Sequence, residues 1–290
     1  MTSTGTEMPF AAGSASAEAD HLVAQLREIV RHTLRRKGVV LGLSGGIDSS
    51  VVAALCARAF GARNVLGLTM HEAESSDDTR RLARIVIDHL GIATIDEPLS
   101  PLLTAAGCYE RRDAAIRKVV PGYGPGWRCK LVLPSVVDTE QLRISSVIAR
   151  SPDGEELRAR LPAEAYLQVV AATSFKQRAR KMLEYYHADR LNYAVAGTPN
   201  RLEYELGFFV KNGDGAADVK PIAHLYKTQV YQLAELLDIP AEIRARPPTT
   251  DTYSLPQSQE EFYFALPYAR MDACLQACDH AIPAAEAAAG

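Results

Sequence analysis

The sequence lacks long apolar runs and a strong net charge. No apolar run is long enough to span a bilayer and no segment has the pattern of a signal peptide, so we expect no membrane contact. The formal net charge of −3 and the pI near 6.2 give no overall attraction to nucleic acids. These absences argue against membrane proteins and basic nucleic-acid binders.

Cysteines are also few. The five cysteines include no Cys-x-x-Cys pair, which argues against a disulfide framework or a zinc ribbon. Cys274 and Cys278 lie on one predicted helix, but no histidines are spaced with them, so we interpret both as ordinary buried thiols. We therefore expect a protein of the reducing cytoplasm.

The composition is that of a globular domain. With 47% hydrophobic and 23% charged residues, 290 residues can form one large α/β domain or two small ones. Residues 1–17 are rich in Ser, Thr, Gly and Ala, which predicts a disordered leader. Helical spacing of apolar residues begins near Glu18, and the Ala-rich residues 283–290 predict a frayed tail. The folded domain is thus expected to span 18–282.

Apolar strands and helices alternate through the chain as in a parallel sheet. Strands are predicted over 39–43, 64–70, 93–97 and 192–197, with helices over 50–60, 76–90, 99–120 and 163–186. This rhythm predicts an α/β fold with a doubly wound, mostly parallel sheet. Such sheets bind ligands beyond the carboxyl ends of their strands, so the loops at 44–49 and 70–76 should be neighbours.

A segment at 121–162 interrupts this alternation. Alternating residues at 142–150 and 155–161 flank Ser-Pro-Asp-Gly, which predicts an inserted antiparallel β-hairpin. A hairpin is marginal alone and must pack on the body or on a partner subunit. Either a lid or a structural addition fits this position. Trp127 fits a hydrophobic anchor for the insert better than a stacking platform for a ring.

The most specific stretch is Gly-Val-Val-Leu-Gly-Leu-Ser-Gly-Gly-Ile-Asp-Ser-Ser at 38–50. Gly45 and Gly46 allow successive N–H groups to converge on an anion, and the following helix adds its positive dipole end. Asp48 among anion-binding groups requires a divalent cation between it and a phosphate. No Gly-Lys-Ser/Thr closes the loop, so it is not a Walker loop. The predicted phosphate-binding residues are Ser44, Gly45, Gly46, Asp48, Ser49 and Ser50.

Ser-Gly-Gly-Ile-Asp-Ser resembles the pyrophosphate loop of the ATP pyrophosphatase superfamily, which has the adenine nucleotide α-hydrolase fold, and its flanks resemble NAD synthetases. A second match runs from Gly197-Thr198 through Glu203 and Lys211 to Asp218. The resemblance implies that Glu203 binds Mg²⁺ with the ATP phosphates and that Lys211 and Asp218 bind the acid substrate. Asp48 and Glu203 form a suitable pair, since Mg²⁺ prefers one or two carboxylates plus phosphate oxygens.

Further motifs extend this resemblance. By position, Met70 is implied to contact the adenosine, and Thr198 to lie near the adenine or the reacting groups. Lys227 and Thr249 are implied to contact the ATP phosphates. In the helix at 163–186, Arg178 and Arg180 match arginines beside the dinucleotide substrate, whereas Ser174 stands where the family usually has asparagine. The residues implied to bind the acid substrate are Ser174, Arg178, Lys211 and Asp218.

The resemblance implies an ammonia-dependent ligase related to NAD synthetase, with ATP and Mg²⁺ as cofactors. The carboxylate of deamido-NAD attacks the α-phosphorus of ATP, pyrophosphate leaves, and ammonia displaces AMP to give the amide. Asp48, Glu203 and Lys227 are the implied catalytic residues. Ammonia is expected to be free or to come from a separate glutaminase, and the family resemblance implies a homodimer.

Three alternatives stay open. The insert, Ser174 and the unusual segment at 257–268 suit a related ligase that acts on another carboxylic acid. A tRNA-thiolating enzyme shares the pyrophosphate loop, but the net negative charge and the absence of paired cysteines argue against it. A nucleotide sensor without catalysis is the third, and Asp48, Glu203 and Lys227 argue against it.

Overall fold

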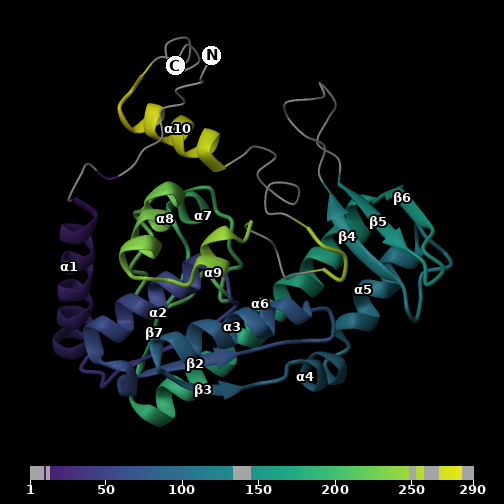
Figure 1. Cartoon of the computed structure of the whole chain (residues 1–290). Helices are drawn as coiled ribbons and strands as arrows, with labels where there is room; N and C mark the ends of the chain where they lie inside the picture. Colours follow the sequence, from purple (N-terminus) through teal and green to yellow (C-terminus); the bar gives the residue numbers. More distant parts are fainter. Residues whose placement is uncertain (1–9, 11–13, 133–144, 248–252, 258–267, 283–290) are drawn as a thin grey trace.

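A parallel sheet forms the centre of the molecule. The computed structural model describes residue 10 and residues 14–132, 145–247, 253–257 and 268–282. Strands β1 (Val39–Gly42), β2 (Val65–Thr69), β3 (Ala93–Asp96) and β7 (Ala194–Val195) lie side by side in the order β3-β2-β1-β7, and every pairing is parallel. Helices cover both faces of this sheet (Figure 1), which confirms the predicted doubly wound α/β fold.

Alternate residues of the central strand enter two different cores. Val39 and Leu41 pack on one face with α1, α2, α3 and α8, whereas Val40 packs on the other face with α6. Both faces are buried, which explains why the strand is apolar without alternation. The covering helices are α1 (Ser14–Arg27, continued by a π-helix at Glu28–Thr33), α2 (Ile47–Phe60), α3 (Asp77–Leu90), α6 (Ala163–Leu191), α8 (Lys227–Leu236) and α9 (Ala241–Ala245).

Several predicted boundaries move for local reasons. The helix predicted over 99–120 is two helices, α4 (Ser100–Ala105) and α5 (Cys108–Arg117), because Gly107 takes a left-handed conformation with φ of 66°. Strand β7 is shorter than predicted because Asn192, with φ of 56°, still caps α6. The first helix begins at Ser14, before the predicted start. The tail at 283–290 lies outside the described residues.

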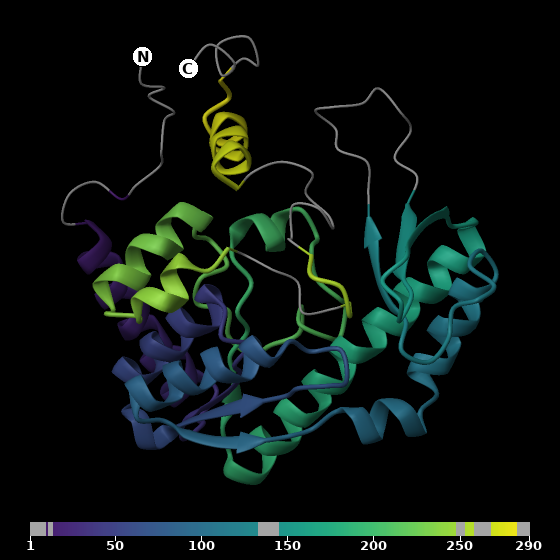
Figure 2. The ribbon, with the colours of Figure 1, turned by 45° about the vertical axis from the view of Figure 1, so that its right-hand side comes forward.

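A second, antiparallel sheet contains the predicted hairpin. Strands β4 (Arg128–Val132), β5 (Ser146–Arg150) and β6 (Glu156–Arg160) pair in the order β4-β5-β6, and β5 and β6 are joined by the predicted turn at 151–154. Val147 and Ala149 pack with residues of α5 and α6, at the end of α6 away from the main sheet (Figure 2). Trp127 contacts this core, with its ring centroid 5.8 Å from that of Tyr123, as expected of an anchor.

A segment near the C-terminus follows the outer side of β4. The side chain of Ser254 accepts a hydrogen bond from the N–H of Cys129 at 2.8 Å, and the N–H of Leu255 donates to the carbonyl of Cys129 at 3.1 Å. The Arg128 guanidinium donates to the Ser254 carbonyl at 2.7 Å. Residues 253–257 are therefore fastened to the small sheet.

The remaining helices, α7 (Arg201–Glu205) and α10 (Tyr268–Asp279), pack together beside α8. Cys274 and Cys278, predicted to be buried, are exposed, because α10 buries its opposite side through Tyr268, Met271 and Asp272. None of the described helices is both long and apolar enough to span a membrane.

A buried charge network ties the loop after β2 to α5 and α6. Lys176 pairs with Glu72 at 2.8 Å and with Glu74, and Arg112 pairs with Glu74 and with Asp113 at 2.7 Å. Burial raises the pKa of Glu72, but the charge and hydrogen bond of Lys176, together with the hydrogen bond of Tyr109 and the charge of Arg180, hold that pKa below its ordinary value. The network fixes the loop that begins at Met70.

Replacing Lys176 tests how much this network contributes to the free energy of unfolding. Lys176→Met leaves the buried carboxylate of Glu72 without its cation and leaves Glu74 paired with Arg112 alone. We therefore expect the free energy of unfolding to fall by about 3–5 kcal/mol in a urea titration. The control is Lys118→Met, whose partner Glu164 is largely exposed, and it should cost less than about 1 kcal/mol. Equal losses in the two variants would contradict this assignment.

Candidate functional site

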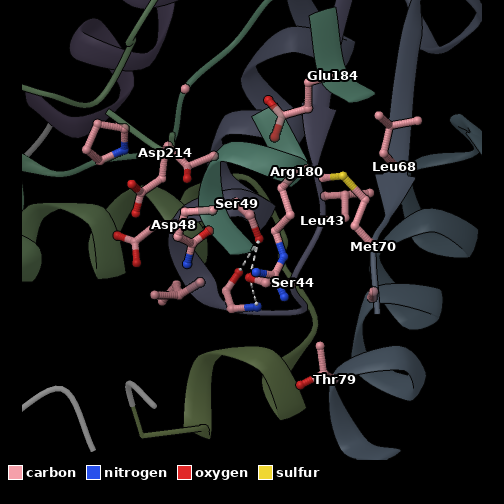
Figure 3. Close-up of a pocket in the computed structure, with 18 of the residues that line it drawn as sticks. Leu43, Ser44, Asp48, Ser49, Leu68, Met70, Thr79, Arg180, Glu184 and Asp214 are labelled. Carbon is pink, nitrogen blue, oxygen red and sulfur yellow. Dashed lines mark hydrogen bonds between the residues drawn. The ribbon is translucent and has the colours of Figure 1, made fainter. Parts of the chain in front are cut away.

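A cavity of about 300 Å³ opens at the carboxyl ends of β1, β2 and β7. Its walls come from the glycine loop, the loop after β2, helix α6, the segment after β7 and helix α8 (Figure 3). The predicted neighbours at 44–49 and 70–76 do meet here, through Ser44 and Met70. The polar lining residues include Ser44, Asp48, Ser49, His71, Thr79, Arg80, Gln177, Arg180, Lys181, Glu184, Thr198, Glu203, Asp214 and Lys227.

The glycine loop is shaped by packing and by its own hydroxyl groups. Gly45 has φ of +69°, and a Cβ there would lie 2.6 Å from the Cβ of Leu82, so only glycine fits. The hydroxyl groups of Ser49 and Ser50 donate to the carbonyl of Gly46 at 3.0 and 2.8 Å. Gly45 and the fully buried Ser50 thus support the loop on the side away from the cavity. Ser44, Gly46, Asp48 and Ser49 line the cavity.

The three predicted catalytic residues come together from three helices. Asp48 lies in the first turn of α2, Glu203 in α7, and Lys227 is the first residue of α8. The Lys227 amino group forms an ion pair with Asp48 inside the cavity. Asn200 joins the two acids, because its Nδ2 donates to Asp48 Oδ1 at 3.3 Å and its N–H donates to Glu203 Oε2 at 3.1 Å.

The formal charges of Asp48, Glu203 and Lys227 do not sum to zero when all three are ionised. Burial, and then the nearby charge of Asp48, raise the pKa of Glu203 to about 8, although Lys227 opposes this rise. Burial alone would lower the pKa of Lys227, but the charges of Asp48 and Glu203 and the hydrogen bond to Asp48 together raise it. One lysine therefore faces two carboxylates. Carboxylate oxygens are ligands that favour the binding of a further cation.

Helix α6 supplies a second charged wall. Gln177, Arg180, Lys181 and Glu184 follow helical spacing and share one side of α6. Lys181 pairs with Glu184 at 2.6 Å. Arg180 extends toward Ser44 and Ser49 (Figure 3) and has no hydrogen bond or ion pair with any other residue that the structure describes. Lys181, Glu184 and Asp214 were not among the predicted site residues, although the helical spacing could have identified the first two.

The residues predicted to bind the acid substrate lie outside this cavity. Arg178 is exposed and its Nε donates to the carbonyl of Lys211 at 3.0 Å. Asp218 accepts from the N–H of Val195 at 2.8 Å and so supports the end of β7. Ser174 lies on α6 before Gln177 and is half-buried. Their predicted role stays a prediction.

The predicted ATP residues fall into two groups. Met70 and Thr198 line the cavity together with the glycine loop and Lys227. Thr249 lies outside the described residues. Its neighbours Arg246 and Pro247 line the cavity.

Comparisons with known proteins agree with the resemblance. A family model described as NAD synthase matches residues 18–120 and 137–289 and leaves out 121–136, within the predicted insert. The NH(3)-dependent NAD(+) synthetase of Mesorhizobium japonicum is 62% identical over 275 residues, which are 95% of this chain and 86% of that protein. The enzyme of the same name from Rhizobium meliloti is 59% identical over 93% of this chain and 81% of that protein.

Solved structures share the fold. NMN synthetase from Francisella tularensis superposes with a TM-score of 0.66 at 24% identity and covers 90% of this chain and 86% of its own. NH3-dependent NAD synthetase from Campylobacter jejuni gives a TM-score of 0.58 at 23% identity, over 92% and 84%. At these identities the likeness concerns the fold alone.

The raised pKa of Glu203 predicts a dependence of stability on pH. The unfolded chain loses this proton near pH 4.5 and the folded chain near pH 8, so the unfolded state binds fewer protons between these values and stability falls as pH rises. We expect Glu203→Gln to remove about 3–4 kcal/mol of this fall between pH 5 and pH 8, measured by urea unfolding. Glu205→Gln, on the exposed side of the same helix, is the control. Parallel pH profiles for wild type and Glu203→Gln would contradict the assignment.

Proposed function

The chain belongs to the NAD synthase family, and from that premise we propose that it is an ammonia-dependent NAD(+) synthetase. It uses MgATP to activate the carboxylate of deamido-NAD and then forms the amide with ammonia. The observation that supports this best is the meeting of the glycine loop with Asp48, Glu203 and Lys227 in one cavity. It is an ATP-dependent, AMP-forming carbon–nitrogen ligase.

The first step transfers the adenylyl group. A carboxylate oxygen forms a bond to the α-phosphorus of ATP, the bond from that phosphorus to the bridging oxygen breaks, and pyrophosphate leaves with the electron pair. Negative charge accumulates on the leaving group, so cations and N–H donors placed around it lower the barrier. Lys227, Arg180 and the loop at 44–49 are the groups that this cavity offers to pyrophosphate.

The second step needs no side-chain nucleophile. Ammonia attacks the acyl carbon, the bond to the AMP oxygen breaks, and the amide forms with loss of a proton. The chain contributes positioning of the two reactants. The ammonia is free, as in the relatives named NH(3)-dependent, or it is supplied by a separate glutaminase.

Asp48 and Glu203 are the residues that would hold Mg²⁺. Both are carboxylates at one cavity wall. Burial, and then the nearby charge of Asp48, raise the pKa of Glu203, which fits a site built for a cation. When bound, the ion neutralises phosphate charge. Lys227 forms an ion pair with Asp48 at the same wall.

The substrates are assigned by the same resemblance. Adenosine lies against Met70 and Thr198, which line the cavity, and the ATP phosphates extend to Lys227 and Thr249. The acid substrate is held by Ser174, Arg178, Lys211 and Asp218. Arg178 supports this assignment, because it fixes the carbonyl of Lys211 at 3.0 Å and so keeps that loop beside α6.

A homodimer explains an exposed apolar stripe on α6. Leu167, Phe175, Met182 and Tyr186 are 36–63% exposed and recur 8, 7 and 4 residues apart, so they lie along one side of the helix. A row of large apolar side chains favours an interface. The same row on a second copy of the chain is the proposed partner. The five cysteines form no disulfide, which fits a cytoplasmic protein.

The reaction is tested by pyrophosphate release from MgATP with ammonium. We expect release that depends on deamido-NAD and yields NAD, and a loss of at least about a hundredfold for Asp48→Ala, since it removes one metal-binding carboxylate. Glu235→Ala, on the exposed side of α8, is the control and should keep full activity. A wild-type protein that binds ATP yet releases no pyrophosphate with deamido-NAD would favour another carboxylic acid.

The proposed dimer is tested by light scattering after gel filtration. Met182→Asp places a charge in the stripe, so we expect the dimer dissociation constant to rise at least about tenfold. Leu236→Asp, at a similarly exposed apolar position on α8, should leave the dimer intact. A dimer that withstands Met182→Asp, or a monomeric wild type, would refute this interface.

A further inference from the structure

Helix α8 begins at the cavity lysine but is capped from a distant part of the chain. The carboxylate of Asp272, on α10, accepts hydrogen bonds from the N–H groups of Lys227 at 3.3 Å and Thr228 at 2.9 Å. The first N–H groups of a helix have no partner within the helix, and the residue before it usually caps them. Here that residue is Tyr226, whose hydroxyl group instead bonds Asp279.

Asp272 is buried for this contact. Its relative exposure is 1%, and a buried carboxylate is costly unless N–H groups and dipoles stabilise it. Burial raises the pKa of Asp272, while the N–H groups of Thr228 and Lys227 oppose this rise. A neutral residue would fill the space without that cost. The acid is therefore matched to the positive end of α8.

Lys227 is consequently held at both ends. Its N–H is fixed by Asp272 and its amino group by Asp48. The ring of Tyr268, one turn before Asp272 on α10, lies with its centroid 5.2 Å from the Lys227 Nζ. Two residues of α10 thus contact the backbone and the side chain of one lysine.

The far end of α10 is anchored to the same two helices. Asp279 accepts a hydrogen bond from Arg201 at 2.8 Å and one from Tyr226. Arg201 is two positions before Glu203 on α7, and Met271 packs with Leu202 between the two helices. Helix α10 therefore bridges the helices that carry Glu203 and Lys227.

We infer that Asp272 is a positioning residue for Lys227, acting through the hydrogen bonds that cap the first turn of α8. Lys227 is the first residue of α8, so an uncapped first turn would let its Cα move and withdraw the amino group from the cavity. The inference rests on the proposed binding of ATP phosphates beside Lys227. Asp272 itself touches no substrate.

The test measures the dissociation constant of MgATP by calorimetry, with the full chain. Asp272→Ala should raise it by about tenfold, because the cap is lost and Lys227 is displaced. Asp272→Asn, which keeps the shape and one acceptor, should give a smaller rise and serves if the alanine variant does not fold. The control is Asp279→Asn, which weakens the docking of the same helix but leaves the N–H groups of α8 capped, and it should change the constant by less than about twofold.

A double-mutant cycle separates positioning from general destabilisation. If Asp272 acts through Lys227, Asp272→Ala should weaken MgATP binding no further in a Lys227→Met background. Equal weakening in both backgrounds, or an effect of Asp279→Asn as large as that of Asp272→Ala, would overturn the inference. If wild type binds MgATP and Asp272→Ala binds it equally well, only this inference falls. If wild type does not bind MgATP, the proposed function falls with it.

Discussion

The repulsion between two carboxylates in one cavity is the constraint on which the site depends. Asp48 and Glu203 are both near the start of a helix, where the dipole favours negative charge. Lys227 also begins a helix, where the same dipole opposes its charge. Its position is stable because Asp48 takes its amino group and Asp272 takes its N–H. The three charged residues thus lie on three separate helices, and the relative positions of these helices must be kept for the charges to stay together.

Helix α6 holds the parts of the fold around the cavity in their relative positions. It has 29 residues, a length of about 44 Å at 1.5 Å per residue. One part packs under the central sheet, the middle supplies Arg180 and Lys181 to the cavity, and the other end carries the small sheet. Lys176 adds buried ion pairs to the loop after β2. A displacement of this helix would therefore alter the cavity on two sides at once.

Much of this arrangement could be predicted from the sequence, and the failures have physical causes. Apolar runs between helical patterns predicted the parallel sheet, and motif order brought Asp48, Glu203 and Lys227 together. The break at Gly107 was missed because a left-handed residue depends on its surroundings. The contact between Asp272 and Lys227 joins residues 45 positions apart, and local spacing carries no signal for it. The motif alone did not distinguish Arg180, which lines the cavity, from Arg178, which does not. The face of α6 on which each arginine lies makes the difference, and Arg178 donates to the carbonyl of Lys211 instead.

The small sheet has two outer strands, and each is shielded in a different way. Unpaired strand edges invite pairing with other chains and so promote aggregation. On β4, residues 253–257 occupy the outer side through Ser254 and Leu255. Strand β6 is mostly exposed but carries Glu156, Arg158 and Arg160, whose charges disfavour stacking of like strands. This sheet is therefore protected against edge-to-edge association. The chain carries a second β-sheet beside the central one without an open strand edge that would promote fibre formation.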